Sequence, residues 1–125
     1  MYLPELLVDL TTHYNALIRS AAAQLNLTAS QAFHLISIPH DGISMSKLAH
    51  RLGLDTSTLT RNVQKLENLE LVERKHDPYD KRVQKAVLTE RGNEITEEIE
   101  ELLLQINNSI MGQIDLDSQE NMYDI

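Results

Sequence analysis

The sequence predicts a mainly α-helical protein with one small β-hairpin, an α+β fold. Apolar residues recur every three or four positions over several segments, which is the spacing of amphipathic helices. Two short segments, residues 71–74 and 83–88, are expected to be strands because a loop of turn-forming and charged residues separates them. The length of 125 residues and the 42% hydrophobic content suit one domain with a core of its own.

The first helix is expected over residues 4–24, where Pro4 suits the first turn. Its apolar stripe is expected to be the buried face, and consists of Leu6, Leu7, Leu10, Tyr14, Leu17, Ile18 and Leu25. A second helix is expected to begin after Thr28, because Thr28 and Gln31 have the spacing of a capping box. Residues 39–42, with their Pro and Gly, end it. The residues of this helix that are expected to face inward are Phe33, Leu35 and Ile36.

Two further short helices are expected to meet at a tight turn. Ser44 caps the first, whose Leu48, Ala49 and Leu52 share one face, and Gly53 ends it in a left-handed conformation. Asp55 caps the second, which is expected to extend over about residues 56–69. Such a pair is a helix-turn-helix, and with the hairpin that follows it makes a winged helix. The inner stripe of the second helix is Leu59, Val63, Leu66 and Leu69.

A long helix is expected after the hairpin, with Thr89 as its cap and an end near residue 111. A last helix is expected to start within residues 119–125. The apolar residues of the long helix are Ile95, Ile99, Leu102, Leu103, Ile106 and Ile110.

Charge divides the chain into unlike parts. The formal net charge is −8, yet ten of the 11 Lys and Arg residues lie between Ser44 and Arg91. That window carries +3 and the remainder −11. A local cluster of cations attracts a polyanion whatever the total charge, although chance clustering on a solvated surface gives the same pattern.

The second helix of the helix-turn-helix carries the candidate base-reading residues. With Leu59 at the centre of the buried face, Ser57, Arg61 and Gln64 point nearly opposite. Small hydroxyl residues let the backbone approach a major groove, and Arg61 suits a guanine edge. An ordinary capped helix with a solvated Arg61 is the alternative. The candidate DNA-binding residues of this helix are Thr56, Ser57, Thr58, Thr60, Arg61, Gln64 and Lys65.

The hairpin supplies a second set of candidates. Lys81 and Arg82 lie near its tip, where a minor groove attracts guanidinium groups, and Asp80 is placed to hold the Arg82 side chain. The alternative is a charged tip that serves solubility alone. The candidate wing residues are Arg74, Lys75, Asp80, Lys81, Arg82 and Lys85, of which Arg74, Lys75 and Lys85 are expected at phosphates.

The string from Ser46 to Glu67 resembles the helix-turn-helix of the MarR family of bacterial transcription regulators, as does the segment 69–74. Residues 77–82 resemble that family's Asp-x-Arg wing, and residues 87–92 its Leu-Thr-x-x-Gly entry into the long helix. The resemblance covers about residues 25–110. It implies that Ser57, Thr58, Thr60 and Arg61 take the recognition-helix role and that Asp80 and Arg82 take the wing role.

The resemblance also implies a homodimer that binds a pseudo-palindrome and responds to small, often anionic aromatic ligands. The expected organisation is an N-terminal dimerisation helix (1–27), a winged helix-turn-helix domain (28–91) and a C-terminal dimerisation helix (92–125). Two departures stand out. The family usually has Gly at the position of Glu70, which predicts a differently shaped helix end. The chain stops soon after Ser118, where the family has a final dimerisation helix. Either the dimer forms with fewer contacts or the sequence is truncated.

The apolar stripes of the first and long helices exceed what one winged domain can cover, which predicts a dimer that buries about 2,000 Å² or more. Packing within one chain is the alternative. A small-molecule effector is a further candidate partner, with Tyr14, Phe33, His34 and His40 as a possible pocket or as ordinary core residues. No metal site and no cofactor are expected, because the five histidines have no ligand spacing.

The sequence therefore predicts a sequence-specific regulator of transcription that binds double-stranded DNA, in the form of a ligand-responsive repressor. A winged domain used for protein–protein contact is the alternative. An enzyme is not expected, since the sequence has no Gly-rich phosphate loop and no cysteine nucleophile. With no apolar run of about 20 residues and no secretory signal, the expected location is the cytoplasm.

Overall fold

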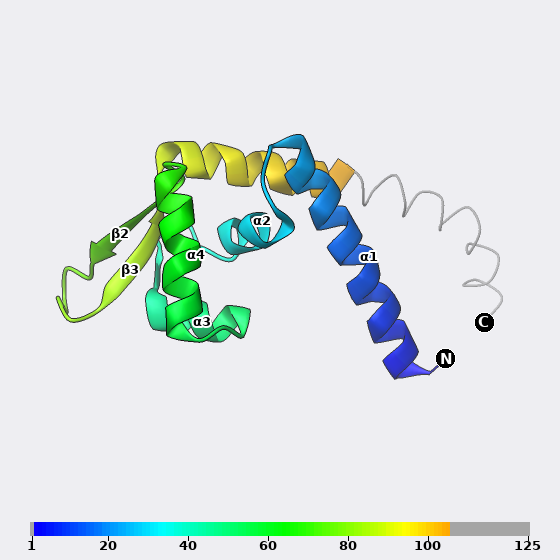
Figure 1. Ribbon diagram of the computed structural model, residues 1–125, viewed down its shortest axis with the longest axis horizontal. Helices are drawn as coiled ribbons and strands as arrows, with labels where there is room; N and C mark the ends of the chain where they lie inside the picture. The colour runs from blue at the N-terminus through cyan, green and yellow to red at the C-terminus, as the bar shows by residue number, and fades with distance from the viewer. Residues whose placement is uncertain (1, 106–125) are drawn as a thin grey trace.

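The computed structural model describes residues 2–105, and its elements follow the predicted order (Figure 1). The helices are α1 (Leu3–Gln24), α2 (Ala29–Ile36), α3 (Met45–Leu52) and α4 (Thr56–Asn68), and the strands are β1 (Ile43–Ser44), β2 (Val72–His76) and β3 (Gln84–Leu88). Residues 90–105, the described part of the C-terminal helix, are helical throughout. This confirms the mainly α fold with a winged helix-turn-helix.

Each predicted cap is present. The Thr28 hydroxyl accepts from the Gln31 backbone N–H at 3.0 Å, and the Gln31 side chain accepts from the Thr28 N–H at 3.0 Å, which completes the capping box. The side chains of Ser44, Asp55 and Thr89 cap the next three helices at 3.2, 2.7 and 2.9 Å. Local sequence therefore sets where these helices begin.

Three helices end in the same left-handed motif. Asn26, Gly53 and Glu70 have φ angles of 59°, 67° and 63°, and the residue after each donates its backbone N–H to a carbonyl five residues back. Glu70 thus adopts the conformation that favours glycine. The prediction of a differently shaped end was wrong: the backbone turn forms, with an L-residue in a strained position.

The sheet has one strand more than the sequence predicts. Its order is β1-β3-β2, all antiparallel, and β1 pairs Ile43 with Ala86. Between β2 and β3, Val72 lies opposite Leu88 and Lys75 opposite Lys85. The added strand joins the segment before α3 to the wing, so the helix-turn-helix and the hairpin are one unit.

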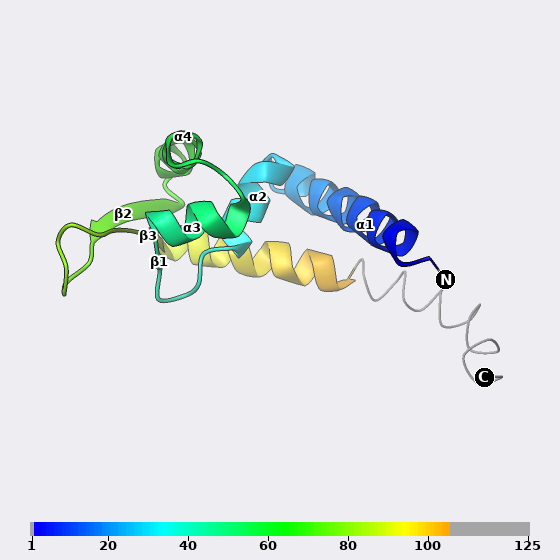
Figure 2. The same cartoon turned by 90° about the horizontal axis from the view of Figure 1, so that it is seen from below.

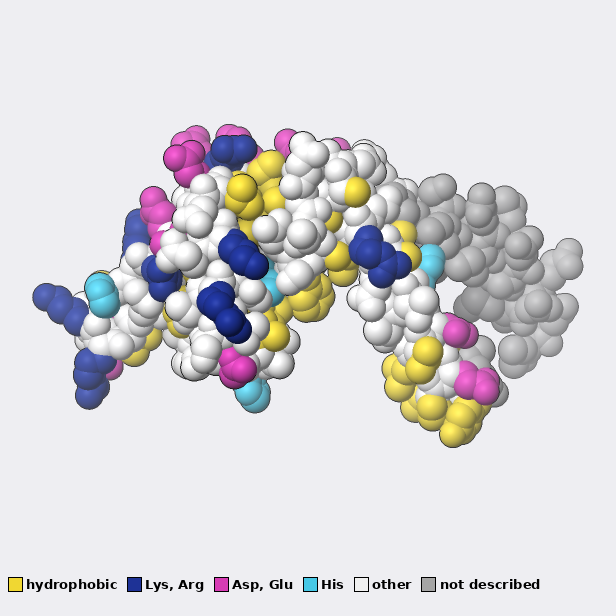
Figure 3. Space-filling model, viewed as in Figure 1, with side chains coloured by type: hydrophobic (Ala, Val, Ile, Leu, Met, Phe, Trp, Pro, Cys, Tyr) yellow, Lys and Arg dark blue, Asp and Glu magenta, His cyan; other side chains and the backbone are white. Residues whose placement is uncertain are grey.

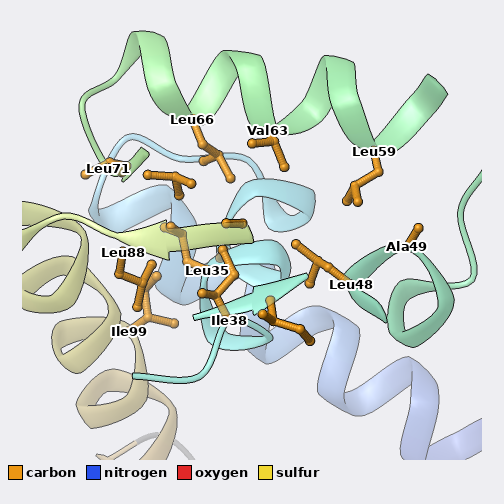
Figure 4. Close-up of a cluster of buried hydrophobic side chains, with 14 of the residues drawn as sticks. Leu35, Ile38, Leu48, Ala49, Leu59, Val63, Leu66, Leu71, Leu88 and Ile99 are labelled. Atoms are coloured by element: carbon orange, nitrogen blue, oxygen red, sulfur yellow. The ribbon is translucent and has the colours of Figure 1, made fainter. Parts of the chain in front are cut away.

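The core lies beneath α4 (Figure 4), where Leu59, Val63 and Leu66 are fully buried against residues of α2, α3 and the sheet. The core extends to Ile18 of α1 and Ile99 of the C-terminal helix, so it joins all three predicted segments.

The predicted burial was wrong at several positions. Leu69 is 41% exposed, because it follows the last turn of α4 and leaves the buried face. Phe33 is 46% exposed, because α2 presents Ala32 and Leu35 to the core. Ile36 is half-buried and packs against the core, as predicted.

The start of the C-terminal helix is tightly joined to the α4–β2 junction. Thr89 donates its hydroxyl to the Glu70 carbonyl at 2.7 Å and its backbone N–H to the Leu71 carbonyl at 3.0 Å. A Cβ on Gly92 would lie 1.9 Å from the Leu71 oxygen. Only glycine fits there, so the close approach explains the Leu-Thr-x-x-Gly pattern.

The first half of α1 differs from the prediction in its burial. Leu17 and Ile18 are buried, but Leu7, Leu10 and Tyr14 are 53%, 44% and 51% exposed. In Figures 1 and 2 this half of α1 extends away from the winged domain, which accounts for the exposure. The predicted positions of Ile106 and Ile110, the helix end near residue 111 and the helix over 119–125 lie outside the described residues. No helix within residues 2–105 has the length and apolar content needed to cross a membrane.

Candidate nucleic-acid interface

The outer face of α4 carries the predicted base-reading residues. Ser57, Arg61 and Gln64 are exposed on the side opposite buried Leu59, as the helical spacing predicts. Thr56, Thr60 and Lys65 are also exposed, whereas Thr58 is half-buried. The helix therefore offers a polar face of short side chains with two long cations, and contact of that face with DNA stays a prediction.

The N-terminus of α4 is already occupied by an anion. The Asp55 carboxylate accepts the Thr58 backbone N–H at 2.7 Å, and this bond, followed by one from the Thr58 hydroxyl, lowers the pKa of Asp55 below its ordinary value of 3.8. The carboxylate stabilises the helix start and offsets part of the positive end of the helix dipole. Attraction of a phosphate to this end therefore depends on nearby cations such as Arg61.

Hydrogen bonds order several side chains on the face. The Thr60 hydroxyl donates to the Thr56 carbonyl at 2.8 Å, and Gln64 donates its amide to Asn68 at 3.1 Å. Arg61 has a long contact of 3.5 Å between its Nη2 atom and the Thr58 hydroxyl. Because that bond is weak, the guanidinium is free to reach a base edge.

Arg74 has a different environment from the one predicted for a phosphate contact. Its Nε atom pairs with Glu67 Oε1 at 2.5 Å, and its Nη2 atom donates to Gln64 Oε1 at 2.8 Å. Its side chain is only 22% exposed. Arg74 therefore joins β2, the first strand of the wing, to α4.

The wing tip confirms the predicted pairing of Asp80 with Arg82. Asp80 Oδ1 accepts from the Arg82 backbone N–H at 3.1 Å and from its Nε atom at 3.0 Å, while Oδ2 accepts from Nη2 at 3.1 Å. This hydrogen bonding lowers the pKa of Asp80 and raises that of Arg82. The Arg82 side chain is 91% exposed, so the carboxylate orients a guanidinium that stands in solvent. Lys81 beside it is also exposed.

Two predicted wing residues lie on the other side of the sheet. Lys75 and Lys85 face each other across β2 and β3, and strand alternation places them opposite the side that Arg74 presents to α4. Lys75 contacts Glu73 at 3.5 Å, and the Lys85 ammonium lies 3.4 Å from the Asp41 carbonyl. Each lysine therefore has an acceptor within the protein, and contact of this pair with a phosphate stays a prediction.

The basic side chains are spread over the face formed by α4 and the wing (Figure 3), while acidic side chains lie mainly at its upper edge. Sequence reasoning missed Asn62 of α4, whose side chain lies 3.1 Å from the His34 ring. No local pattern reveals a pair separated by 28 positions.

The predicted pocket residues Phe33 and His34 border two different hollows. Phe33 borders a hollow of about 230 Å³ between α1 and α2, beside Asn15 and Arg19. His34 borders a second hollow of about 130 Å³ between α2 and α4. Tyr14 is exposed next to the His13 ring, and His40 is exposed in the loop after α2. An effector site that unites them stays a prediction.

Comparisons with known proteins agree with this geometry. The model of the MarR family matches residues 27–83. The chain is similar to a crystal structure of Rv1404 from Mycobacterium tuberculosis, with 28% identity, a TM-score of 0.76, and coverage of 89% of this chain and 78% of that one. No curated protein matches the chain with significant sequence similarity.

Two solved MarR structures are also similar. One is described as the multiple antibiotic resistance repressor MarR, with 26% identity, a TM-score of 0.84, and coverage of 98% of this chain and 91% of that one. The other is a mutant MarR from E. coli complexed with operator DNA, with 25% identity, a TM-score of 0.72 and the same two coverages, 98% and 91%. The family match covers the helix-turn-helix and the first strand and loop of the wing, and the structural likenesses extend over nearly the whole chain, so together they support a MarR-family winged-helix regulator.

Proposed function

We propose that the protein is a transcription regulator that binds a pseudo-palindromic operator in double-stranded DNA as a homodimer and acts as a ligand-responsive repressor. The observation that carries the proposal is the pairing of an exposed polar face on α4 with a wing whose Arg82 is held outward by Asp80. A helix that reads the major groove and a basic tip that enters the minor groove are the two contacts of such regulators.

The similar MarR structure with operator DNA supports the DNA part of the proposal. The expected division of labour follows from the side chains. Arg61, weakly held and exposed, suits a base edge, and Arg82 suits the negative potential of a minor groove. Arg74 acts within the protein, because Glu67 and Gln64 already engage it.

The homodimer is supported by the apolar residues that α1 leaves exposed: Leu3, Leu7, Val8, Leu10 and Tyr14, all between 44% and 63%. An exposed apolar surface of this extent marks an interface. A second copy of the chain supplies a matching surface, and a two-fold axis would present two recognition helices to successive major grooves. The effector is proposed to bind near the hollow between α1 and α2 that Phe33 and Arg19 border.

The test begins with selection of bound sequences from a randomised duplex pool, followed by fluorescence anisotropy on the selected duplex. We expect a palindromic site and an affinity that falls steeply with salt. Arg61→Ala is expected to relax the preference at one base pair in each half-site, by about 1–3 kcal/mol. Arg82→Ala is expected to weaken binding to all duplexes and to reduce the salt slope by about one.

Arg19→Ala, on α1, is the charge-matched control and is expected to leave base preference unchanged when no effector is present. Selection that yields no preferred sequence would contradict the proposal. Recovery of a stoichiometric protein partner without DNA would favour the winged domain as a protein-binding module instead.

A further inference from the structure

His34 is a buried polar residue that the DNA contacts do not use. Its side chain lies on α2 and the residue is only 4% exposed, whereas the apolar residues around it form the core beneath α4. A buried imidazole needs partners for both ring nitrogens, and each nitrogen of His34 has one.

The partners fix which nitrogen carries the proton. His34 Nδ1 lies 2.6 Å from the Ser30 carbonyl oxygen, which can only accept, so Nδ1 must donate. In the neutral ring Nε2 then has a free lone pair. The Asn62 amide nitrogen lies 3.1 Å from Nε2 and can only donate, so it supplies the matching proton.

This bridge joins α2 to the recognition helix. Asn62 follows Arg61 in the sequence and lies one helical turn after Thr58, next to the proposed base-reading residues. The bridge borders the hollow between α2 and α4, whose charged lining residue is Lys65. The other attachments of this part of α4 are the apolar contacts of Leu59 and Val63, which have little directional preference, and the contacts of Arg74 that begin at Gln64.

We propose that His34 is a positioning residue for DNA reading. With its proton on Nδ1, the ring accepts the Asn62 amide N–H at Nε2 and, together with the Arg74 contacts to Gln64 and Glu67, fixes the rotation of α4 about its own axis. Because the outer face of α4 carries Arg61 and its neighbours, this rotation decides which side chains meet the base edges. The inference rests on the proposed function, since it assigns a role within DNA reading to a residue that does not touch DNA.

The test uses the full chain with two substitutions that remove the bridge, His34→Leu and Asn62→Ala. Each is expected to lower the ratio of selected-site to random-duplex affinity by about threefold to tenfold, the usual worth of one hydrogen bond. The affinity for a random duplex is expected to stay the same. The double variant is expected to lower this affinity ratio no further than either single variant, because both substitutions remove the same hydrogen bond.

Two further variants separate positioning from simple stability. His34→Gln places an acceptor near the position of Nε2 and is expected to restore most of the ratio. His40→Leu, at an exposed histidine, is the matched control and is expected to change nothing. A ratio that is unchanged in both bridge variants, or losses that add in the double variant, would overturn the inference.

A measurement without DNA judges the inference independently. Nitrogen-15 spectra of the His34 ring at pH 7.5 are expected to show the proton on Nδ1, and His34→Leu is expected to shift the backbone amide signals of residues 57–62. A proton on Nε2 would contradict the bridge. Failure of the wild-type chain to select any DNA sequence would contradict the proposed function alone, and the ring spectra and amide shifts would still decide the inference.

Discussion

The winged domain and the first half of α1 use similar apolar patterns with opposite results. In α4, Leu59 and Val63 repeat at helical spacing and are fully buried within the chain. In α1, Leu3, Leu7 and Val8 lie on a helix of the same kind and are 61%, 53% and 63% exposed. Figure 3 shows the resulting apolar patch at the N-terminal end of α1.

The difference teaches that periodicity identifies the face of a helix that avoids water, and leaves open what covers it. The winged domain encloses its apolar face because α2, α3 and the sheet surround α4. The first half of α1 has no such neighbours among the described residues (Figure 1). On our proposal, the cover is a second copy of the chain.

Leu59→Ala tests the self-contained side of the comparison and carries the largest expected effect. Leu59 is fully buried, so its truncation leaves a cavity and is expected to lower the free energy of unfolding by about 2–5 kcal/mol. Urea denaturation followed by circular dichroism measures this. Leu69→Ala, at a residue that is 41% exposed after the last turn of α4, is the matched control with a smaller expected change. Equal effects at the two sites would refute the assigned core.

Replacing Leu7 and Leu10 with Glu tests the other side. Charges on this face oppose contact with a second copy, so the double variant is expected to be a folded monomer. Its affinity for the operator is expected to fall by about 100-fold, near 2.7 kcal/mol, because two half-sites no longer bind together. Sedimentation and anisotropy measure both changes. A variant that remains dimeric would show that another surface holds the two copies together.

Glu70→Gly sharpens the comparison within the winged domain. Glu70 has a φ of 63°, where glycine is free of the Cβ strain, so the substitution is expected to raise the free energy of unfolding by about 1 kcal/mol. If the winged domain is a unit of its own, the gain measured by urea denaturation persists in the monomeric Leu7 and Leu10 variant. A loss of stability would mean that the Glu70 side chain makes a compensating contact.

The smallest expected effect concerns pH at the wing. The pKa of Asp80 lies below its ordinary value of 3.8 because Arg82 donates to the charged carboxylate. A lowered pKa in the folded state means that the pairing contributes its full stability above the ordinary pKa of 3.8, and that this contribution is lost as the pH falls through the lower pKa of folded Asp80. The Asp80 carboxyl carbon signal is therefore expected to stay constant from pH 8 to pH 5. In Arg82→Ala, its midpoint is expected to move up toward 3.8. An unmoved midpoint would assign the lowered pKa to another cause.

The sequence predicts best what depends on near neighbours. The caps at Thr28, Ser44 and Asp55 and the Asp80–Arg82 pair join residues two or three positions apart, and all are present. Features that depend on distant partners were missed. Strand β1 has two residues and exists because β3 lies beside it.

The same limit applies to the site. The contacts of Arg74 with Glu67 and Gln64 join residues seven and ten positions apart. They hold the Arg74 side chain against α4, although its place on the hairpin sequence suggests an exposed cation like the other wing residues. The His34–Asn62 bridge requires α2 and α4 to be packed first. Exposure of α1 depends on the direction in which α1 leaves the domain, which composition and spacing do not encode.

The lack of space at Gly92 has a mechanical consequence. The Leu71 carbonyl lies so close to Gly92 that the C-terminal helix and the start of β2 are expected to move as one rigid body. A tilt of the C-terminal helix would therefore move the β2–β3 hairpin by the same rotation. In the proposed dimer, the opening angle between the two C-terminal helices would set how far apart the two wing tips stand.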